Sequence, residues 1–433
     1  MSFGSKKIGL LDHMGAGNLG DDTTQTAVMN NIKRRWPNVQ IYGFSMNPSD
    51  TQQRHGIPSY AIRRATWGSN QKTNGAATFK TRARDALREH HNLYAFLKAL
   101  DAITLKGPRA LISELVFLAK SFNIIRTFDI LIISGGGQLL DSWGGPWKFP
   151  YTIFKWVLLA KLAGVKCYFV NVGAGPLQHP LSKFFIARAL RIADYVSFRD
   201  EKSKTLAREV GFTGEAQVFP DCVYGFDTHH LCNKRIEARD GLVVGLSPMA
   251  YCDPARYWIQ DQIAYESFVR KLARFGSWLS HRHNLTIFST DVWFDSQVLI
   301  DLNGALKRET DFDQTHLLEQ NPIVTTDDLL SRMSSLNYII TCRFHGVVFA
   351  HLMNIPVIAI SHHPKVTTLM ADLGLSKYCL DIDTFDIKLL MDTFTHLAID
   401  GERIKARMAE KLAVYRGALT SQFDQLFSPE AAK

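Results

Sequence analysis

An Arg-Phe-His triplet, Arg343, Phe344 and His345, follows a short apolar run at residues 338–340. An apolar run that ends abruptly in polar residues is typical of a buried strand meeting its loop. The planar guanidinium of arginine matches the oxygens of a carboxylate or a phosphate, and histidine exchanges protons near neutral pH. The triplet therefore indicates an anion site with a proton-transfer group. A surface arginine beside a buried core histidine is the alternative explanation.

A second apolar run, residues 356–360, ends in Ser361, His362 and His363, and Lys365 follows after a proline. In open α/β sheets, ligands bind beyond the carboxyl ends of the strands, where loops and helix N-termini converge. Both polar strand ends are therefore expected to face one cleft. The two histidines could make phosphate binding there depend on pH.

Two glycine-rich turns also follow apolar runs. Glycine lets a backbone approach a ligand closely, and a helix that follows presents free N–H groups. The spacing is neither that of a dinucleotide fingerprint nor that of a P-loop, and ordinary strand-to-helix turns would also explain these glycines. The residues predicted to bind a ligand here are Gly17, Asn18, Gly20, Gly136 and Gly137.

Arg199 stands at the end of another expected strand, residues 195–198, before a helix. A cation at a helix N-terminus is unfavourable unless it faces an anion, so Arg199 contacts either a ligand or a neighbouring acid. Asp21 and Asp221 follow strand ends too, and they are candidate general bases. Each could equally cap a helix or accept a structural hydrogen bond.

The elements that hold these residues alternate between strand and helix along the chain. This alternation predicts an α/β fold with parallel, doubly wound sheets, and 433 residues favour two domains. We expect an N-terminal domain over residues 1–226 with a basic helical insertion at about 50–125, a linker at 227–240, and a C-terminal domain over 241–385. A helical segment, 386–433, could cross back to the first domain. Residues 47–69 lack periodicity and are expected to form a loop or linker.

The chain resembles the polysaccharide pyruvyltransferases over residues 8–385. The matching motifs occur in this order: GNLGDD (17–22), ISGGGQLLD (133–141), VGAGPL (172–177), SFRDEKS (197–203), VFPD (218–221), CRFHG (342–346) and SHHPKV (361–366). The resemblance implies a GT-B-like pair of Rossmann-like domains that face each other across a cleft. It also implies transfer of a pyruvyl group from phosphoenolpyruvate to a sugar.

By this resemblance, the donor-binding positions are Arg199, Arg343, Phe344, His345 and Lys365. We assign His345 as general acid for the methylene carbon of the donor, because it adjoins Arg343. Phosphoenolpyruvate is the donor substrate, and neither a separate cofactor nor a metal is expected. One alternative is a GT-B nucleotide-sugar glycosyltransferase. Another is a catalytically silent carbohydrate-binding or sensing protein on the same scaffold.

Composition narrows the remaining possibilities. Hydrophobic residues make up 46% and charged residues 21% of the chain, as in ordinary globular proteins. The N-terminal apolar run is too short for a signal peptide, and six cysteines without paired spacing fit reduced thiols. We therefore expect a cytoplasmic protein. Its oligomeric state is left open.

The net charge of +9 is concentrated in residues 54–109, where eleven Lys or Arg face three acids, a balance of 11 − 3 = +8. Such a segment attracts anionic partners. It suggests peripheral association with the inner face of a membrane and a glycan or lipid-linked oligosaccharide acceptor, although a solvated helix face would carry the same charge. Nucleic acid is not expected, because no recognised nucleic-acid motif accompanies the charge.

Overall fold

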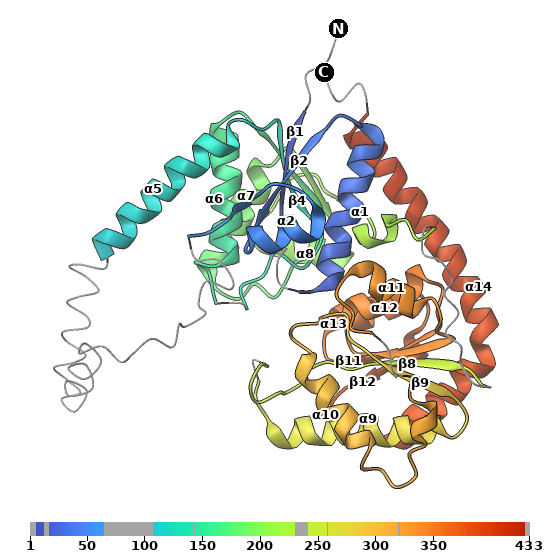
Figure 1. Ribbon diagram of the computed structural model, residues 1–433. Coiled ribbons are helices and arrows are strands. Elements are labelled where there is room, and N and C mark those ends of the chain that lie inside the picture. The colour runs from blue at the N-terminus through green and yellow to red at the C-terminus, as the bar shows by residue number, and fades with distance from the viewer. Residues whose placement is uncertain are drawn as a thin grey trace, which may run out of the picture.

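The computed structural model describes residues 6–12, 17–64, 107–142, 144–229, 241–257, 259–318 and 321–428. These residues form two sheets, each flanked by helices, one above the other in Figure 1. All strand pairs in both sheets are parallel. The predicted α/β fold with two doubly wound units is confirmed.

The first sheet has seven strands in the order β3-β2-β1-β4-β5-β6-β7. The strands are β1 (Lys7–Leu11), β2 (Gln40–Ser45), β3 (Ser59–Ala61), β4 (Ile130–Ser134), β5 (Lys166–Val172), β6 (Tyr195–Phe198) and β7 (Gln217–Val218). The order reverses between β1 and β4. The loops after these two strands therefore diverge at a topological switch point, where ligands of such folds bind.

Helices cover both faces of this sheet. They are α1 (Leu19–Arg35), α2 (Pro48–His55), α5 (Gly107–Ile125), α6 (Phe149–Leu162), α7 (Pro180–Ile192), α8 (Glu201–Glu209) and the short η2 (Cys222–Gly225). Side chains alternate along β4, as the period of two requires. Ile132 shares a core with Val28 of α1, whereas Ile133 shares a core with Trp156 of α6. This double burial explains why β4 reads as one continuous apolar run.

The second sheet has five strands in the order β12-β11-β10-β8-β9. They are β8 (Val243–Ser247), β9 (Asn284–Ile287), β10 (Tyr338–Thr341), β11 (Val357–Ser361) and β12 (Cys379–Asp381). The helices are α9 (Gln262–Ser280), α10 (Ser296–Leu306), η3 (Gln314–His316), α11 (Thr326–Met333), α12 (Phe344–Leu352), α13 (Pro364–Asp372), η4 (Ser376–Tyr378) and α14 (Ile387–Leu426). The loops after β9, β10 and β11 are directed toward the first sheet.

The last helix, α14, runs beside both sheets (Figure 1). Near its start Phe394 packs in the second core, and near its end Phe423 packs in the first. Gln422 exchanges hydrogen bonds with the buried Asn171 of β5: Asn171 Nδ2 donates to Gln422 Oε1 over 3.0 Å, and Gln422 Nε2 donates to Asn171 Oδ1 over 2.7 Å. The helix therefore returns to the first domain.

Residues 47–69 depart from the expected loop. The described part, up to residue 64, contains α2 and the edge strand β3. Asn47 caps α2 by accepting from Asp50 N over 3.4 Å, and Pro48 supplies the first helical residue. The prediction of a loop was therefore wrong for this part of the chain. The eight residues of α2 and the three residues of β3 are too few to show a helical or strand periodicity in the sequence.

Most of the predicted basic insertion, residues 65–106, and most of the predicted linker, residues 230–240, lie outside the described residues. Within the described part of the chain, no helix combines the length and apolar character needed to cross a membrane.

Candidate active site

Arg343 lies between the end of β10 and the start of α12. Its backbone is extended at the N-cap, with φ −93° and ψ 143°, which directs the side chain away from the helix. Its Nε donates to Asp295 Oδ2 over 2.9 Å, and its Nη2 donates to Asp295 Oδ1. Asp291 lies 3.7 Å from the same Nη2. These contacts hold the guanidinium by its Nε–Nη2 edge.

His345 lies in the first turn of α12 and is buried. Its ring packs against Gly20 of α1, so closely that a Cβ on Gly20 would lie 2.0 Å from Cγ and Nδ1. The buried Nε2 has no hydrogen-bond partner among the described residues. Burial lowers the pKa of His345 well below its ordinary value, and the neighbouring Arg199, Lys365 and Arg343 lower it further. The imidazole is therefore neutral in the free protein.

Arg199 belongs to the first domain but contacts the second. Its guanidinium carbon lies 4.6 Å from the centre of the Phe344 ring. It also covers Gly173 in the loop after β5, where a Cβ would come within 2.6 Å of the guanidinium. Asp200 and Asp221 lie 3.5 Å away. Arg199 therefore contacts neighbouring acids and also lies beside Phe344 of the predicted donor site, so both alternatives predicted for it occur together.

Lys365 follows β11, lies in the first turn of α13 and approaches the same Phe344 ring as Arg199. Its Nζ lies 5.7 Å from the centre of the Phe344 ring. Burial lowers the pKa of Lys365 to about 8, with Arg199 and Arg343 acting in the same direction and Asp21 opposing. The ammonium group therefore remains charged at neutral pH but holds its proton less firmly than usual.

His362 and His363 do not add charge to this cluster. Burial, followed by the charge of Lys365, lowers the pKa of His362 to about 3 and that of His363 to about 4. His363 Nδ1 accepts a hydrogen bond from Lys365 N over 3.2 Å and thereby caps α13. Neither histidine titrates near neutral pH, so the expected pH dependence does not arise from them.

The two candidate bases have different surroundings. Asp221 caps η2 by accepting from Val223 N over 3.1 Å, which is the structural alternative that its sequence position allowed. Asp21 lies buried in the first turn of α1. Burial, with the neighbouring Asp22 and Asp291, raises the pKa of Asp21 to about 7, against the opposing charges of Lys365 and Arg199.

Gly136 and Gly137, which were predicted to bind the donor, lie next to the charged side chains of the candidate site. Gly136 lies beside the Asp12 and Asp21 carboxylates, 3.5 and 3.6 Å from the place of its absent Cβ. The corresponding point at Gly137 is 3.8 Å from Arg199 Nη2. At these two glycines the backbone borders the charged cluster, as the turn after β4 predicted.

Gly17 and Asn18 instead join the two domains. Asn18 forms an isolated antiparallel bridge with Asp291, and Val292 N donates to Gly17 O over 3.2 Å. The Asn18 side chain is used as the N-cap of α1, where it accepts from Gly20 N over 3.0 Å. These residues set the distance between the domains, and no donor contact is needed to explain them.

The structure brings together the predicted site residues from six loops on two sheets. Sequence reasoning missed three further positions: Asp295, which holds Arg343; Phe294, whose ring centre lies 5.2 Å from the Arg343 guanidinium; and Gly173. Asp295 follows a strand end, and Gly173 belongs to the VGAGPL motif, so both positions carried a signal. Among the described residues, no group of three or more His, Cys, Asp or Glu side chains could hold a metal ion.

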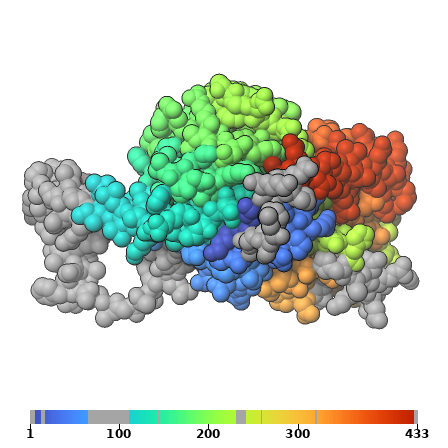
Figure 2. Space-filling view, turned by 90° about the horizontal axis from the view of Figure 1, so that it is seen from above, coloured from blue at the N-terminus to red at the C-terminus, as the bar shows by residue number. Residues whose placement is uncertain are grey.

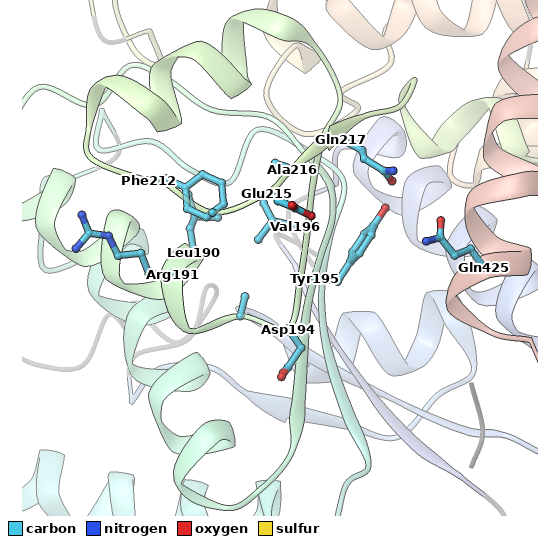
Figure 3. A pocket seen from close by; sticks show the side chains of 12 residues that line it. Leu190, Arg191, Asp194, Tyr195, Val196, Phe212, Glu215, Ala216, Gln217 and Gln425 are labelled. Carbon is cyan, nitrogen blue, oxygen red and sulfur yellow. The ribbon is translucent and has the colours of Figure 1, made fainter. Parts of the chain in front are cut away.

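A surface pocket of about 330 Å³ lies elsewhere, at the amino end of β6 (Figure 3). Its walls include Tyr195, Phe212 and Glu215. Arg191 at its rim donates to Gly211 O, and Asp194 pairs with Lys161 over 2.7 Å. Ligands of parallel sheets bind at the opposite, carboxyl ends, and none of the predicted site residues lines this pocket.

Comparison with known proteins completes this description. The family model for polysaccharide pyruvyl transferase matches residues 18–364. No curated protein matches the sequence.

Among solved structures, the UDP-GlcNAc 2-epimerase from Neisseria meningitidis bound to UDP-GlcNAc is similar, with 10% identity, a TM-score of 0.54, and coverage of 97% of this chain and 99% of that chain. The HepE protein of Anabaena in complex with UDP has 11% identity, a TM-score of 0.53 and 97% coverage of both chains. The MnaA protein of S. aureus with UDP has 10% identity, a TM-score of 0.52, and coverage of 94% and 91%. At such identities these structures show the fold alone, and they confirm the predicted GT-B-like architecture.

Proposed function

The chain belongs to the polysaccharide pyruvyl transferase family, and from this premise we propose that it uses phosphoenolpyruvate as pyruvyl donor. The acceptor is a pair of sugar hydroxyls on an exopolysaccharide or another cell-surface glycan, and the product is a pyruvate ketal. The acceptor is carried either by a glycan chain or by a lipid-linked oligosaccharide.

One observation carries this proposal: Arg199 from the first sheet and Lys365 from the second both approach the Phe344 ring, beside Arg343 and His345. Cations drawn from two domains suit a small ligand that carries a phosphate and a carboxylate. Arg343 is held by Asp295, and Arg199 lies 3.5 Å from Asp200 and Asp221, whereas Lys365 forms no ion pair with the described residues. Lys365 is therefore the cation most available to the donor.

The neutral state of His345 fits a role that begins only when the donor binds. The cations that depress its pKa would be compensated by the donor's phosphate and carboxylate, so the pKa of His345 would rise in the complex. A protonated His345 then delivers a proton to the methylene carbon as a sugar hydroxyl attacks C2. Attack by the second hydroxyl closes the ketal and expels inorganic phosphate.

Asp21 is the second group able to exchange a proton in this cluster. With a pKa near 7, its carboxyl group is ionised in about half of the molecules at neutral pH. It accepts the proton of the attacking hydroxyl when ionised, or shares a proton with the donor phosphate when neutral. Asp221, engaged with Val223 N and Arg199, serves mainly to position Arg199.

Thermal unfolding with phosphoenolpyruvate titrated in is the first test. A ligand that binds only the folded protein raises the melting temperature with concentration. We expect this rise in the wild type and in the matched control Arg403→Ala, whose side chain is 75% exposed on α14. We expect it to vanish in Lys365→Met, which removes a half-buried cation without breaking an ion pair to any described residue.

The same assay distinguishes the proposed pyruvyltransferase from the alternative, a nucleotide-sugar glycosyltransferase. The similar epimerase structure holds UDP-GlcNAc, so UDP-GlcNAc is titrated in parallel. Stabilisation by UDP-GlcNAc and not by phosphoenolpyruvate would replace the proposed donor with a nucleotide sugar. His345→Gln then tests the mechanism: donor-dependent stabilisation should persist while phosphate release with a glycan acceptor is lost.

A further inference from the structure

The first domain exposes an apolar surface on the side of its sheet that α5, α6 and α7 cover (Figure 1). On α5, four aliphatic side chains recur at helical spacing and are 49–62% exposed: Leu111, Ile112, Leu115 and Val116. Trp147, Leu158, Leu162 and Phe184 are exposed on and beside the neighbouring α6 and α7. We call these eight residues the α5–α7 face.

This face holds half of the large apolar side chains that the described part of the chain exposes. Soluble proteins rarely leave such groups clustered unless the cluster binds something. In Figure 2, the cyan surface of α5 stretches away from the green body of the domain.

Contacts between the helices hold α5, α6 and α7 together. Trp147 packs against Tyr151 with ring centres 5.5 Å apart, and Tyr151 Oη donates to Glu114 of α5 over 3.4 Å. Phe154 of α6 packs against Phe184 of α7 with ring centres 6.4 Å apart. The exposed apolar residues of the face are therefore carried by three helices that contact one another.

The charges of the three helices identify the partner. Their sequences contain seven Lys or Arg and a single acid, Glu114, a balance of 7 − 1 = +6. Glu114 is itself paired with Arg64 over 2.7 Å and with Lys155 over 3.1 Å. The face therefore offers no unpaired carboxylate on these helices.

Exposed cations stand directly beside the exposed rings. Lys148 follows Trp147 and is exposed. The Arg188 guanidinium lies 5.5 Å from the centre of the Phe184 ring, and Lys183 precedes that ring in the sequence. Apolar and aromatic side chains mixed with Lys and Arg are the composition of surfaces that rest on anionic membranes.

A second copy of the chain fits this face poorly. Two such faces brought together would set the exposed cations Lys148, Lys183 and Arg188 against the same cations of the other copy, with no unpaired carboxylate on these helices to compensate them. An anionic bilayer supplies both the apolar layer and the negative headgroups.

The face also lies next to the candidate active site. The loop after β4 carries Gly136 and Gly137 of the site and then leads, ten residues later, to Trp147 and the start of α6. Parallel α/β connections place the start of α6 at the carboxyl end of the sheet, which is the end that faces the cleft. A molecule anchored in a bilayer under this face could reach the cleft.

We propose that the α5–α7 face binds an anionic lipid bilayer and presents the cleft to lipid-linked acceptors. Binding to a bilayer is inferred from the α5–α7 face alone, whereas the use of lipid-linked acceptors rests on the proposed function. Leu115 and Val116 enter the interface, and Lys148, Lys183 and Arg188 contact the headgroups.

Co-sedimentation with vesicles tests the proposal. Wild-type protein should sediment with vesicles of phosphatidylcholine and phosphatidylglycerol, less so as salt rises, and only weakly with phosphatidylcholine alone. The double variant Leu115→Glu, Val116→Glu should bind the anionic vesicles at least about tenfold more weakly than the wild type. Two apolar side chains are lost, and the two new negative charges are repelled by the headgroups. The matched control Ile399→Glu, on α14 and 76% exposed, should bind like the wild type.

Three results would overturn the proposal. The first is absence of wild-type binding to anionic vesicles at low salt, and the second is equal binding of the double variant. The third is a dimer in sedimentation velocity that the double variant abolishes, because the face would then be a contact between copies. Phosphoenolpyruvate should stabilise the double variant as much as it stabilises the wild type. This measurement distinguishes a wrong donor assignment from a wrong assignment of the membrane-binding face.

Discussion

The imidazole of His345 in the second domain rests on Gly20 in the first, with no room between them for a side chain. Gly20 is the second residue of α1, and His345 is the second residue of α12. Two helix N-termini from different domains therefore meet at the proposed proton donor. The hydrogen bond from Leu19 N to Thr290 O, 3.0 Å long, holds the domains at this distance.

Gly20→Ala tests the need for this contact. Alanine favours a helix by up to about 1 kcal/mol over glycine, but its Cβ would overlap the His345 ring. We expect kcat/KM for pyruvyl transfer to fall about tenfold or more while the protein stays folded, because the domains or the ring must move apart. Gly417→Ala is the control, since its added Cβ would meet nothing within 4 Å. Full activity of Gly20→Ala would show that the contact is dispensable.

Asp295→Asn tests how Arg343 is held. Asp295 is fully buried and accepts from Arg343 and from Ala250 N, the latter over 2.9 Å. Asparagine keeps the size but leaves the Arg343 charge without its main partner, which typically costs about 3–5 kcal/mol. Urea denaturation should show this loss, together with weaker donor binding. Glu402→Gln, which breaks an exposed pair with Lys405, should cost under about 1 kcal/mol; equal effects of the two variants would contradict the assignment.

The pH dependence of stability tests the protonation of Asp21. Its pKa is about 7 in the folded protein against an ordinary 3.8, so the folded state binds the proton more tightly than the unfolded state. The stability from this group is fully present below its ordinary pKa and is lost as the pH rises through about 7. Asp21→Asn should therefore unfold at higher temperature than the wild type at about pH 8.5 and should lose this advantage at about pH 5. An advantage that does not change with pH would place the pKa of Asp21 near its ordinary value.

Gln422→Leu tests the docking of α14 on the first sheet. Leucine would remove the two hydrogen bonds that the buried Asn171 amide shares with Gln422. Asn171 would keep its bonds to Pro220 O and Ser197 Oγ but would have one buried N–H without a partner, which costs about 1–3 kcal/mol. Chemical denaturation measures the change. Gln425→Leu, one turn later on the exposed side of the same helix, is the control. If both variants unfold alike, the amide pair does not anchor the helix.

The sequence by itself determined the type and order of most elements. Apolar runs buried on both faces produced the strands β4, β8 and β11, and the polar residues after them located the cleft. This worked because the periods of strand and helix are local properties, written in neighbouring residues. Arg199, Arg343 and His345 could be named for the same reason, since each follows a strand end, whereas Lys365 was predicted from the family resemblance.

Only the tertiary structure decided what these residues touch. Arg199 and Phe344 stand 145 positions apart in the sequence (344 − 199) and meet between the two domains, and Asp295 reaches Arg343 from the start of α10. The short α2 and β3 were missed, because elements of eight and three residues depend on packing against β2 more than on their own pattern. The neutral state of His345 and the raised pKa of Asp21 likewise come from burial and from neighbouring charges, which exist only once both domains have folded and met.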